Sequence, residues 1–268
     1  MGNSFKTILK QTSKDFKNRS VNPPLVRTST MVFKSMSDLR QTQKKSLKNP
    51  RGGYFDYGRQ GTSTTLELEK LLTKLEESYH TFLTPTGFGA VFLTLFSILR
   101  PGDELIIADP VYSPTRNLTE KYLKDFNILA KFYNPNDLST IKKNITKKTK
   151  LIYVENPGSN TFEFQDLGKI LSIAKSKKIY TAIDNTWGTP YFLKPIKLGF
   201  DLSIVSGTKY YSGHSDVMGG SLAVSQRVFR RVLQAHNMTG LRLSPDDAYL
   251  IMRGLRTLDV RLDKHQEN

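Results

Sequence analysis

Short apolar runs alternate with helical segments from residue 62 onward, and this alternation limits the possible folds more than any other feature. Five runs have the length of buried strands: Leu105–Ala108, Leu151–Glu155, Ile179–Asp184, Leu202–Ser206 and Ser221–Val224. Between two of them, Leu167, Ile170, Leu171 and Ala174 share one face of a helix. Strands that alternate with helices predict an α/β fold, with a mostly parallel sheet sandwiched by helices.

A further helix is expected ahead of these strands, where the apolar residues at positions 68, 71, 72, 75 and 79 share one face. Residues 1–60 lack such periodicity. Prolines at positions 23 and 24 and glycines at positions 52, 53 and 58 interrupt this stretch. We therefore expect an extended arm over residues 1–60, with at most one helix near its beginning.

The absence of cysteine removes several kinds of site from consideration. A chain of 268 residues can build a stable core, but without Cys it holds no disulfide, zinc–thiolate site or iron–sulfur cluster. The four histidines have no metal-ligand spacing, so no metal site is predicted. The N-terminus has no apolar signal-peptide core, and the longest apolar stretch, Ala90–Leu99, is too short to span a membrane. We expect a cytoplasmic protein with no membrane partner.

The strong positive charge does not by itself indicate a nucleic-acid partner. The chain has 40 Lys and Arg residues against 24 Asp and Glu, a formal net charge of +16. The basic residues are spread along the sequence, and the densest run, Lys142–Lys150, is interleaved with Asn, Ile and Thr as in an exposed helix end. A nucleic-acid-binding protein shows a concentrated basic face or a recognisable motif, so no nucleic-acid partner is predicted.

Polar residues follow the predicted strands at the edge where ligands bind in sheets of this kind. One candidate is the segment Thr84–Gly89, which precedes an apolar helix. Thr86 can cap that helix and Gly87 allows a ligand to approach the backbone, so the free N–H groups and the helix dipole favour a phosphate. The alternative is an ordinary helix capped by threonine, which offers the same free donors.

Two charged residues follow neighbouring predicted strands. Asp184 ends one buried strand, and Lys209 follows the next, directly after Ser206, Gly207 and Thr208. Together with the phosphate cradle, they suit pyridoxal phosphate: the lysine binds the cofactor covalently, and the carboxylate holds the pyridine nitrogen protonated. The alternative is a surface ion pair between Asp184 and Lys209.

Four segments of the sequence resemble the transsulfuration family of pyridoxal phosphate enzymes, which act in Cys and Met metabolism. Residues Val205–Gly220 are similar to the segment that carries its cofactor lysine, and Tyr57–Thr62 is similar to its Y-x-R-x-G-T arm. Residues Asp184–Trp187 resemble its D-N-T-[WF] motif, and Glu155–Pro157 resembles its E-S-P motif. The resemblance covers essentially the whole chain.

The resemblance implies a role for each candidate site residue. Lys209 is similar to the cofactor lysine, which in this family also moves the Cα proton, and Asp184 to the partner of the pyridine nitrogen. Tyr112 resembles the tyrosine stacked on the cofactor ring. The cofactor phosphate is expected to contact Gly87, Phe88, Ser206 and Thr208 of the same subunit, and Tyr57 and Arg59 of a neighbouring subunit. Lys209, Tyr112 and Tyr57 are the expected catalytic residues of a homodimer or homotetramer with shared active sites.

The same resemblance implies the domain organisation. It predicts an arm at residues 1–60, and at 61–254 the large domain of the PLP-dependent transferase-like fold of the aspartate aminotransferase type I class. Residues 255–268 would open the helix that leads to a small C-terminal domain, which is expected to be missing. In the family that domain carries the arginine for the substrate α-carboxylate, so neither Arg256 nor Arg261 is assigned this role. We therefore expect little lyase activity from residues 1–268 alone.

Within the family, Trp187 and Gly213–Asp216 resemble cystathionine β-lyases. The implied activity is a carbon–sulfur lyase that splits a cystathionine-like thioether, with homocysteine, pyruvate and ammonia as products from cystathionine. Two alternatives stay open: a cystathionine γ-synthase or γ-lyase of the same family, and a non-catalytic remnant that binds the cofactor at best.

Overall fold

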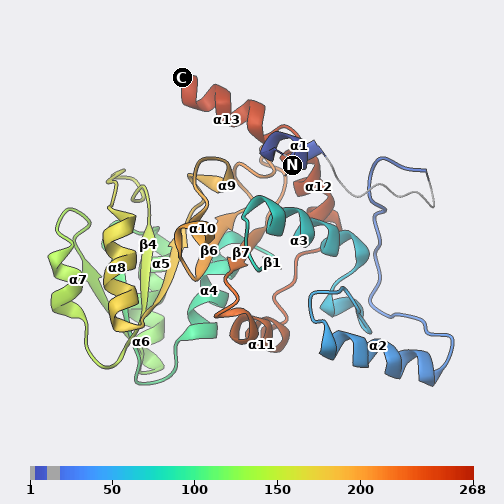
Figure 1. The fold of residues 1–268 in the computed structure, drawn as a ribbon, viewed down its shortest axis with the longest axis horizontal. Coiled ribbons are helices and arrows are strands. Elements are labelled where there is room, and N and C mark those ends of the chain that lie inside the picture. The colour runs from blue at the N-terminus through green and yellow to red at the C-terminus, as the bar shows by residue number, and fades with distance from the viewer. Residues whose placement is uncertain (1–3, 11–18) are drawn as a thin grey trace.

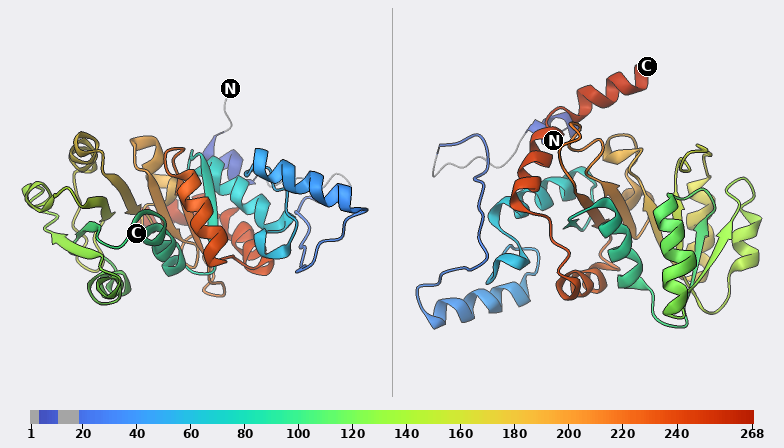
Figure 2. Two further views of the ribbon diagram at one scale, coloured as in Figure 1. Left: turned by 90° about the horizontal axis from the view of Figure 1, so that it is seen from below. Right: turned by 180° about the vertical axis from the view of Figure 1, so that it is seen from behind.

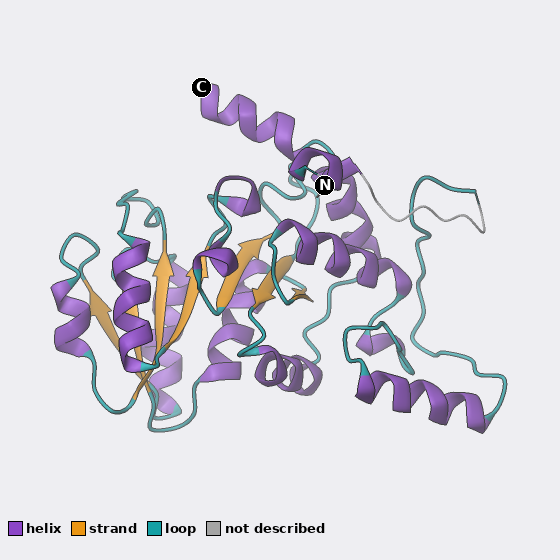
Figure 3. Ribbon diagram, in the orientation of Figure 1, coloured by secondary structure: helices purple, strands orange, loops and turns teal. Residues whose placement is uncertain are grey.

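One sheet of seven strands forms the centre of the protein, with helices on both faces (Figures 1 and 3), which confirms the predicted α/β fold. The computed structural model describes residues 4–10 and 19–268. The strands are β1 (His80–Thr84), β2 (Glu104–Ala108), β3 (Leu129–Tyr133), β4 (Thr149–Glu155), β5 (Tyr180–Asp184), β6 (Leu202–Ser206) and β7 (Gly220–Val224). Their order across the sheet is β1-β7-β6-β5-β4-β2-β3.

The helices alternate with these strands along the chain. Before β4 they are α1 (Phe5–Lys10), α2 (Met36–Lys48), η1 (Gly58–Gln60), α3 (Ser63–Leu75), α4 (Gly87–Ile98), α5 (Ser113–Asn117), η2 (Leu118–Tyr122), α6 (Leu123–Asp125) and α7 (Ser139–Asn144). After β4 they are α8 (Leu167–Lys177), α9 (Thr189–Phe192), α10 (Pro195–Leu198), α11 (Phe229–Thr239), α12 (Pro245–Leu255) and α13 (Leu258–Glu267). Helices α3 and α8 lie on one face of the sheet, and α4, α5 and α6 on the other (Figures 1 and 2).

The sheet is mostly parallel, as predicted, but its last strand is not. Strands β3, β2, β4, β5 and β6 pair in parallel, whereas β7 runs antiparallel to both β1 and β6. The predicted strand 221–224 is therefore present with the reverse direction. Because β6, β5, β4 and β2 run the same way, their carboxyl ends and the residues that follow them meet at one edge of the sheet.

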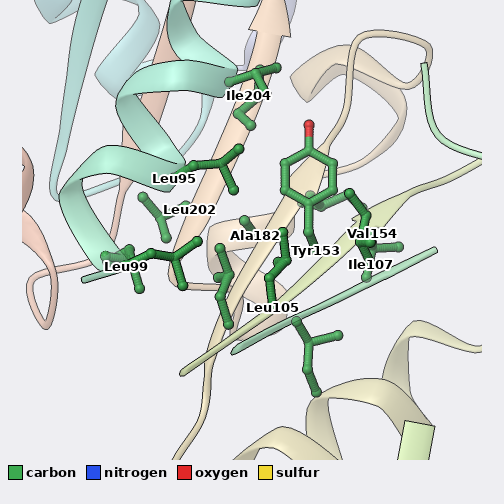
Figure 4. Close-up of a cluster of buried hydrophobic side chains, with 14 of the residues drawn as sticks. Leu95, Leu99, Leu105, Ile107, Tyr153, Val154, Ala182, Leu202 and Ile204 are labelled. Carbon is green, nitrogen blue, oxygen red and sulfur yellow. The ribbon is translucent and has the colours of Figure 1, made fainter. Parts of the chain in front are cut away.

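Apolar side chains of the central strands pack against α4 (Figure 4). Leu95 and Leu99 of this region contact a buried cluster that contains Leu105, Ala182 and Leu202 from three different strands. Strands β1, β2 and β7 are buried along their whole length, and β6 is buried except at Ser206. A core of this kind fixes the strand ends rigidly, which is what a site at the sheet edge requires.

The first 60 residues contain more helix than expected. Helix α2 has 13 residues, buries none of them and lies at the end of the molecule opposite α7 (Figures 1 and 2). It is stabilised locally, because Ser35 accepts the N–H of Asp38 at its beginning. Tyr79 also differs from expectation, since α3 ends at Leu75 and Tyr79 lies in the turn before β1. Among residues 4–10 and 19–268, no helix is long and apolar enough to cross a membrane.

Candidate functional site

The beginning of α4 meets the end of β6. Thr86 caps the helix, as predicted, by accepting the N–H of Gly89 at 2.8 Å, whereas the N–H groups of Gly87 and Phe88 bind no described residue. A Cβ atom on Gly87 would lie 2.6 Å from Oγ of Ser206, so only glycine allows the two elements to approach this closely. Two free N–H groups and the positive end of a helix dipole thus lie beside a hydroxyl group, an arrangement that suits a phosphate.

Thr186 connects Asp184 to this cradle. Its backbone N–H donates to Oδ1 of Asp184 at 3.0 Å, and its Oγ1 accepts the N–H of Ser206 at 2.9 Å. Burial raises the pKa of the Asp184 carboxyl above its ordinary value, while the hydrogen bonds from Thr186 oppose that rise. A cationic group beside this carboxylate would stabilise its charged form.

Lys209 lies three residues after β6, in a turn closed by a 3.2 Å hydrogen bond from its own N–H to the carbonyl of Ser206. Its exposed side chain lines a cleft of about 890 Å³. The other lining residues include Thr186, Trp187, Thr208, Tyr210, Arg261 and His265. The ring of Trp187 packs edge-on against Phe162, with centroids 5.3 Å apart. A cleft of this size holds a ligand as large as a cofactor.

Glu155 and Asp184 end neighbouring strands and lie opposite each other in the β4–β5 register. Glu155 is buried, and its Oε2 accepts the backbone N–H of Tyr112 at 2.7 Å, which holds the candidate stacking residue at the same edge of the sheet. Burial, and then repulsion from Asp184, raise the pKa of Glu155 to about 8. Perturbed carboxyl groups of this kind are typical of functional sites.

Tyr57 and Arg59 lie elsewhere. Neither lines the Lys209 cleft, but Asp184, Gly87, Ser206 and Tyr112 do not line it either. Nη1 of Arg59 donates to the backbone carbonyl of Asn237 at 3.3 Å, and its guanidinium stands 6.0 Å from the centre of the Tyr57 ring. Gly87, Asp184 and Lys209 are instead linked through Ser206, which lies against Gly87, donates to Thr186 and accepts the N–H of Lys209, whereas Tyr57 and Arg59 make none of these contacts. Their contact with a neighbouring subunit stays a prediction.

The structure does not contain the alternative ion pair between Asp184 and Lys209. The ion pairs of the described residues include neither side chain. Two residues of the site, Glu155 and Thr186, are not expected from the sequence, because motifs do not show the contacts between them. Each lies inside a motif, Glu155 at the start of 155–157 and Thr186 within 184–187. Their position directly at strand ends was the available signal.

The donor set fits pyridoxal phosphate. The α4 cradle offers donors for the phosphate of this cofactor, and the carboxyl of Asp184 is a partner for its ring nitrogen. The amine of Lys209 is a partner for its aldehyde. Hydrogen bonds of Thr186 join Asp184 to Ser206, which lies against Gly87 of the cradle, and Thr208 stands directly before the lysine. These groups come from three separate segments of the chain that only the fold brings together.

The chain is similar to known enzymes of sulfur amino-acid metabolism. A curated cystathionine beta-lyase from Bordetella avium is 34% identical over 247 residues, covering 91% of this chain and 61% of that protein. L-methionine gamma-lyase from Pseudomonas putida is 33% identical, covering 92% of this chain and 61% of the enzyme. The crystal structure of a cystathionine gamma synthase from Xanthomonas oryzae in complex with cystathionine superposes with a TM-score of 0.90 at 31% identity, covering all of this chain and 66% of the other.

The chain thus spans about three fifths of the length of the two curated relatives named above. The close superposition confirms the predicted fold of pyridoxal phosphate enzymes. A sequence profile described as Cys/Met metabolism PLP-dependent enzyme matches residues 5–268, which is nearly the whole chain. The protein belongs to the family of Cys/Met metabolism PLP-dependent enzymes, whose cofactor is pyridoxal 5′-phosphate.

Proposed function

We propose that the protein is a pyridoxal phosphate-dependent carbon–sulfur lyase of the cystathionine β-lyase type. The observation that carries the proposal is the convergence of three segments on one edge of the sheet. The α4 cradle, Asp184 and the Lys209 turn are joined there by the hydrogen bonds of Thr186 and by the contact of Gly87 with Ser206. The substrate class is a small amino-acid thioether such as cystathionine.

Each residue has a defined task in this proposal. When bound, pyridoxal phosphate withdraws electrons from the substrate Cα, which allows the Cα–H and Cβ–S bonds to break. Nζ of Lys209 would hold the cofactor and would serve as the base that moves the Cα proton. The carboxylate of Asp184 would hold a proton on the ring nitrogen, and Tyr112 would supply an aromatic ring beside the cofactor.

The cofactor phosphate is assigned to donors from two sources. In the same chain it accepts hydrogen bonds from the N–H groups of Gly87 and Phe88 and from the hydroxyls of Ser206 and Thr208. Tyr57 and Arg59 complete the site from a neighbouring subunit, which makes the active form a homodimer or homotetramer. Arg59 suits that task because, besides one contact to a backbone carbonyl, its planar guanidinium has donors left for a phosphate.

Cofactor binding is the first test. Purified protein incubated with pyridoxal phosphate is expected to develop a visible absorption band, and Lys209→Ala is expected to abolish it. Lys264→Ala, which removes an exposed lysine from α13, serves as the matched control and should keep the band. Absence of the band in the wild-type protein would exclude the cofactor role of this site.

Product analysis separates the alternatives within the family. Pyruvate released from cystathionine indicates β-elimination, whereas 2-oxobutyrate indicates γ-elimination by a γ-lyase. Trp187, which lines the cleft, favours β-elimination, because a tryptophan at this position of the motif resembles the β-lyases. A visible band without either product would favour the third interpretation, a protein that binds the cofactor without turnover.

A further inference from the structure

Arg261 of α13 connects three parts of the structure beside the Lys209 cleft. Its Nη1 donates to the backbone carbonyl of Tyr210 at 2.8 Å, and its Nη2 donates to the backbone carbonyl of Gly254 at 2.8 Å. Its Nε donates to Oγ1 of Thr257 at 3.1 Å. One planar guanidinium therefore joins the residue after Lys209 to the end of α12 and the beginning of α13.

The contact with Tyr210 completes the hydrogen bonding of the turn that carries the lysine. Within that turn, the carbonyl of Ser206 accepts the N–H of Lys209, and the carbonyl of Lys209 accepts the N–H of Gly213 at 2.9 Å. Of the two carbonyls between them, that of Gly207 accepts the N–H of Ser212 and that of Thr208 accepts its hydroxyl. The next carbonyl, that of Tyr210, is bound by Arg261 instead of by the turn itself.

Gly213 shows how closely the guanidinium and the turn are packed. The residue has a φ angle of +73°, and a Cβ atom on it would lie 2.5 Å from Nη1 of Arg261. Glycine thus provides both the left-handed backbone that ends the turn and the space that the arginine occupies. The position of Arg261 and the path of residues 209–213 depend on each other.

We propose that Arg261 is a positioning residue that holds the Lys209 turn in the geometry that cofactor binding requires. The effect on cofactor binding rests on the proposed function, whereas the clamp itself rests on the hydrogen bonds of Arg261 within this chain. Three of the five N–H groups of Arg261 already bind the protein, which favours a clamp over a binding site for a substrate carboxylate. The amine of Lys209 gains affinity for the cofactor because its backbone is fixed in advance.

The clamp is tested first by amide hydrogen exchange in cofactor-free protein. Arg261→Gln removes the contact with the Tyr210 carbonyl, so the N–H groups of Ser212 and Gly213 are expected to exchange about tenfold faster. Lys264→Gln, which removes a positive charge from an exposed position on the same helix, is the matched control and should leave their exchange unchanged.

Cofactor binding gives the second readout. Arg261→Gln is expected to weaken pyridoxal phosphate binding about tenfold and to change the visible circular dichroism per bound cofactor, which a loss of global stability alone would not alter. Arg261→Lys keeps the charge but loses the fork that joins three acceptors, and it is expected to show the same change. This variant decides the question if Arg261→Gln does not fold.

Wild-type exchange rates in Arg261→Gln, or wild-type cofactor affinity and circular dichroism in Arg261→Lys, would overturn the clamp. Failure of the proposed function looks different. In that case the wild-type protein binds no cofactor, while the exchange measurement still decides whether Arg261 holds the turn.

Discussion

At the scale of single residues, the carboxyl pair Glu155 and Asp184 shows how the sheet creates unusual chemistry. The parallel register sets two acids side by side at the ends of β4 and β5. Burial disfavours the charge on each group, so burial raises both pKa values. Glu155 also accepts the backbone N–H of Tyr112, and Asp184 accepts that of Thr186, so both acids hold segments that follow the strand ends.

The repulsion between the two acids can be measured directly. Replacing Asp184 by Asn is expected to lower the pKa of Glu155 from about 8, because it removes the neighbouring negative charge. The pKa should stay above its ordinary value, since burial is the larger cause of the rise. Isotope-edited infrared titration of the Glu155 carboxyl in cofactor-free protein measures the change. Asp109→Asn, at an exposed carboxyl paired with Arg116 on the same edge, should have no effect; equal titration curves for Asp184→Asn and the wild type would contradict the coupling.

At the scale of elements, apolar runs were sufficient to predict strands only where those runs are continuous. Strands β2, β4, β5, β6 and β7 lie within two residues of the predicted bounds. Strand β1 was missed because Thr81 and Thr84 interrupt its apolar pattern, although both are buried and hydrogen-bonded. Edge strand β3 was missed because Lys131 stands in its middle, where it pairs with Glu104. The direction of β7 depends on its pairing partners, which no local pattern encodes.

The candidate site follows the same division between local and long-range information. Lys209, Asp184 and the α4 cradle could be proposed from the sequence because each lies in a short motif at the end of an element. Arg261 was not, because two of its three acceptors are backbone carbonyls, and the acceptor in the Lys209 turn lies 51 residues away along the chain. Every residue has a backbone carbonyl, so the type of the accepting residue does not indicate such a contact.

The cap of α4 allows a test at this scale. Thr86→Ala removes the acceptor for the Gly89 N–H, so the free energy of unfolding is expected to fall by about 1 kcal/mol. Thr86→Ser keeps a hydroxyl at the cap and should lie close to the wild type. Urea denaturation of cofactor-free protein measures both. If Thr86→Ser were as unstable as Thr86→Ala, the methyl group and not the cap would be the stabilising part.

At the scale of the whole molecule, two buried clusters meet at the sheet. The larger contains the central strands with α4, α8 and α11, and the smaller packs α1, α3, α12 and α13 against Leu83 and Val205. Glu76, at the end of α3, is fully buried in the region of the smaller cluster. It accepts hydrogen bonds from the hydroxyls of Tyr211 at 3.1 Å and Ser203 at 3.4 Å. Since Tyr211 belongs to the Lys209 turn, Glu76 links the buried core beneath α3 to the turn that carries the candidate cofactor lysine.

The burial of Glu76 makes the stability of the whole protein depend on pH. Burial raises the pKa of Glu76 from 4.5 to about 8, so between these values the folded protein holds a proton that the unfolded chain has released. The free energy of unfolding therefore falls as pH rises through this window, by up to about 1.4 kcal/mol per pH unit, and levels off above pH 8.

Glu76→Gln stays neutral and keeps an acceptor for Tyr211, so it is expected to gain stability relative to the wild type as pH rises from 4.5 to 8. Urea denaturation at several pH values measures this difference. The contributions of the other buried acids to the pH dependence cancel in it, because both proteins contain them. Glu77→Gln is the matched control: ion pairs with Lys194 and Lys197 lower the pKa of Glu77, so its replacement should cost a little stability and not add any. A constant difference between Glu76→Gln and the wild type across this range would mean that Glu76 is ionised in the folded protein. The hydroxyl of Tyr211 would then donate to a buried carboxylate and not to a neutral carboxylic acid.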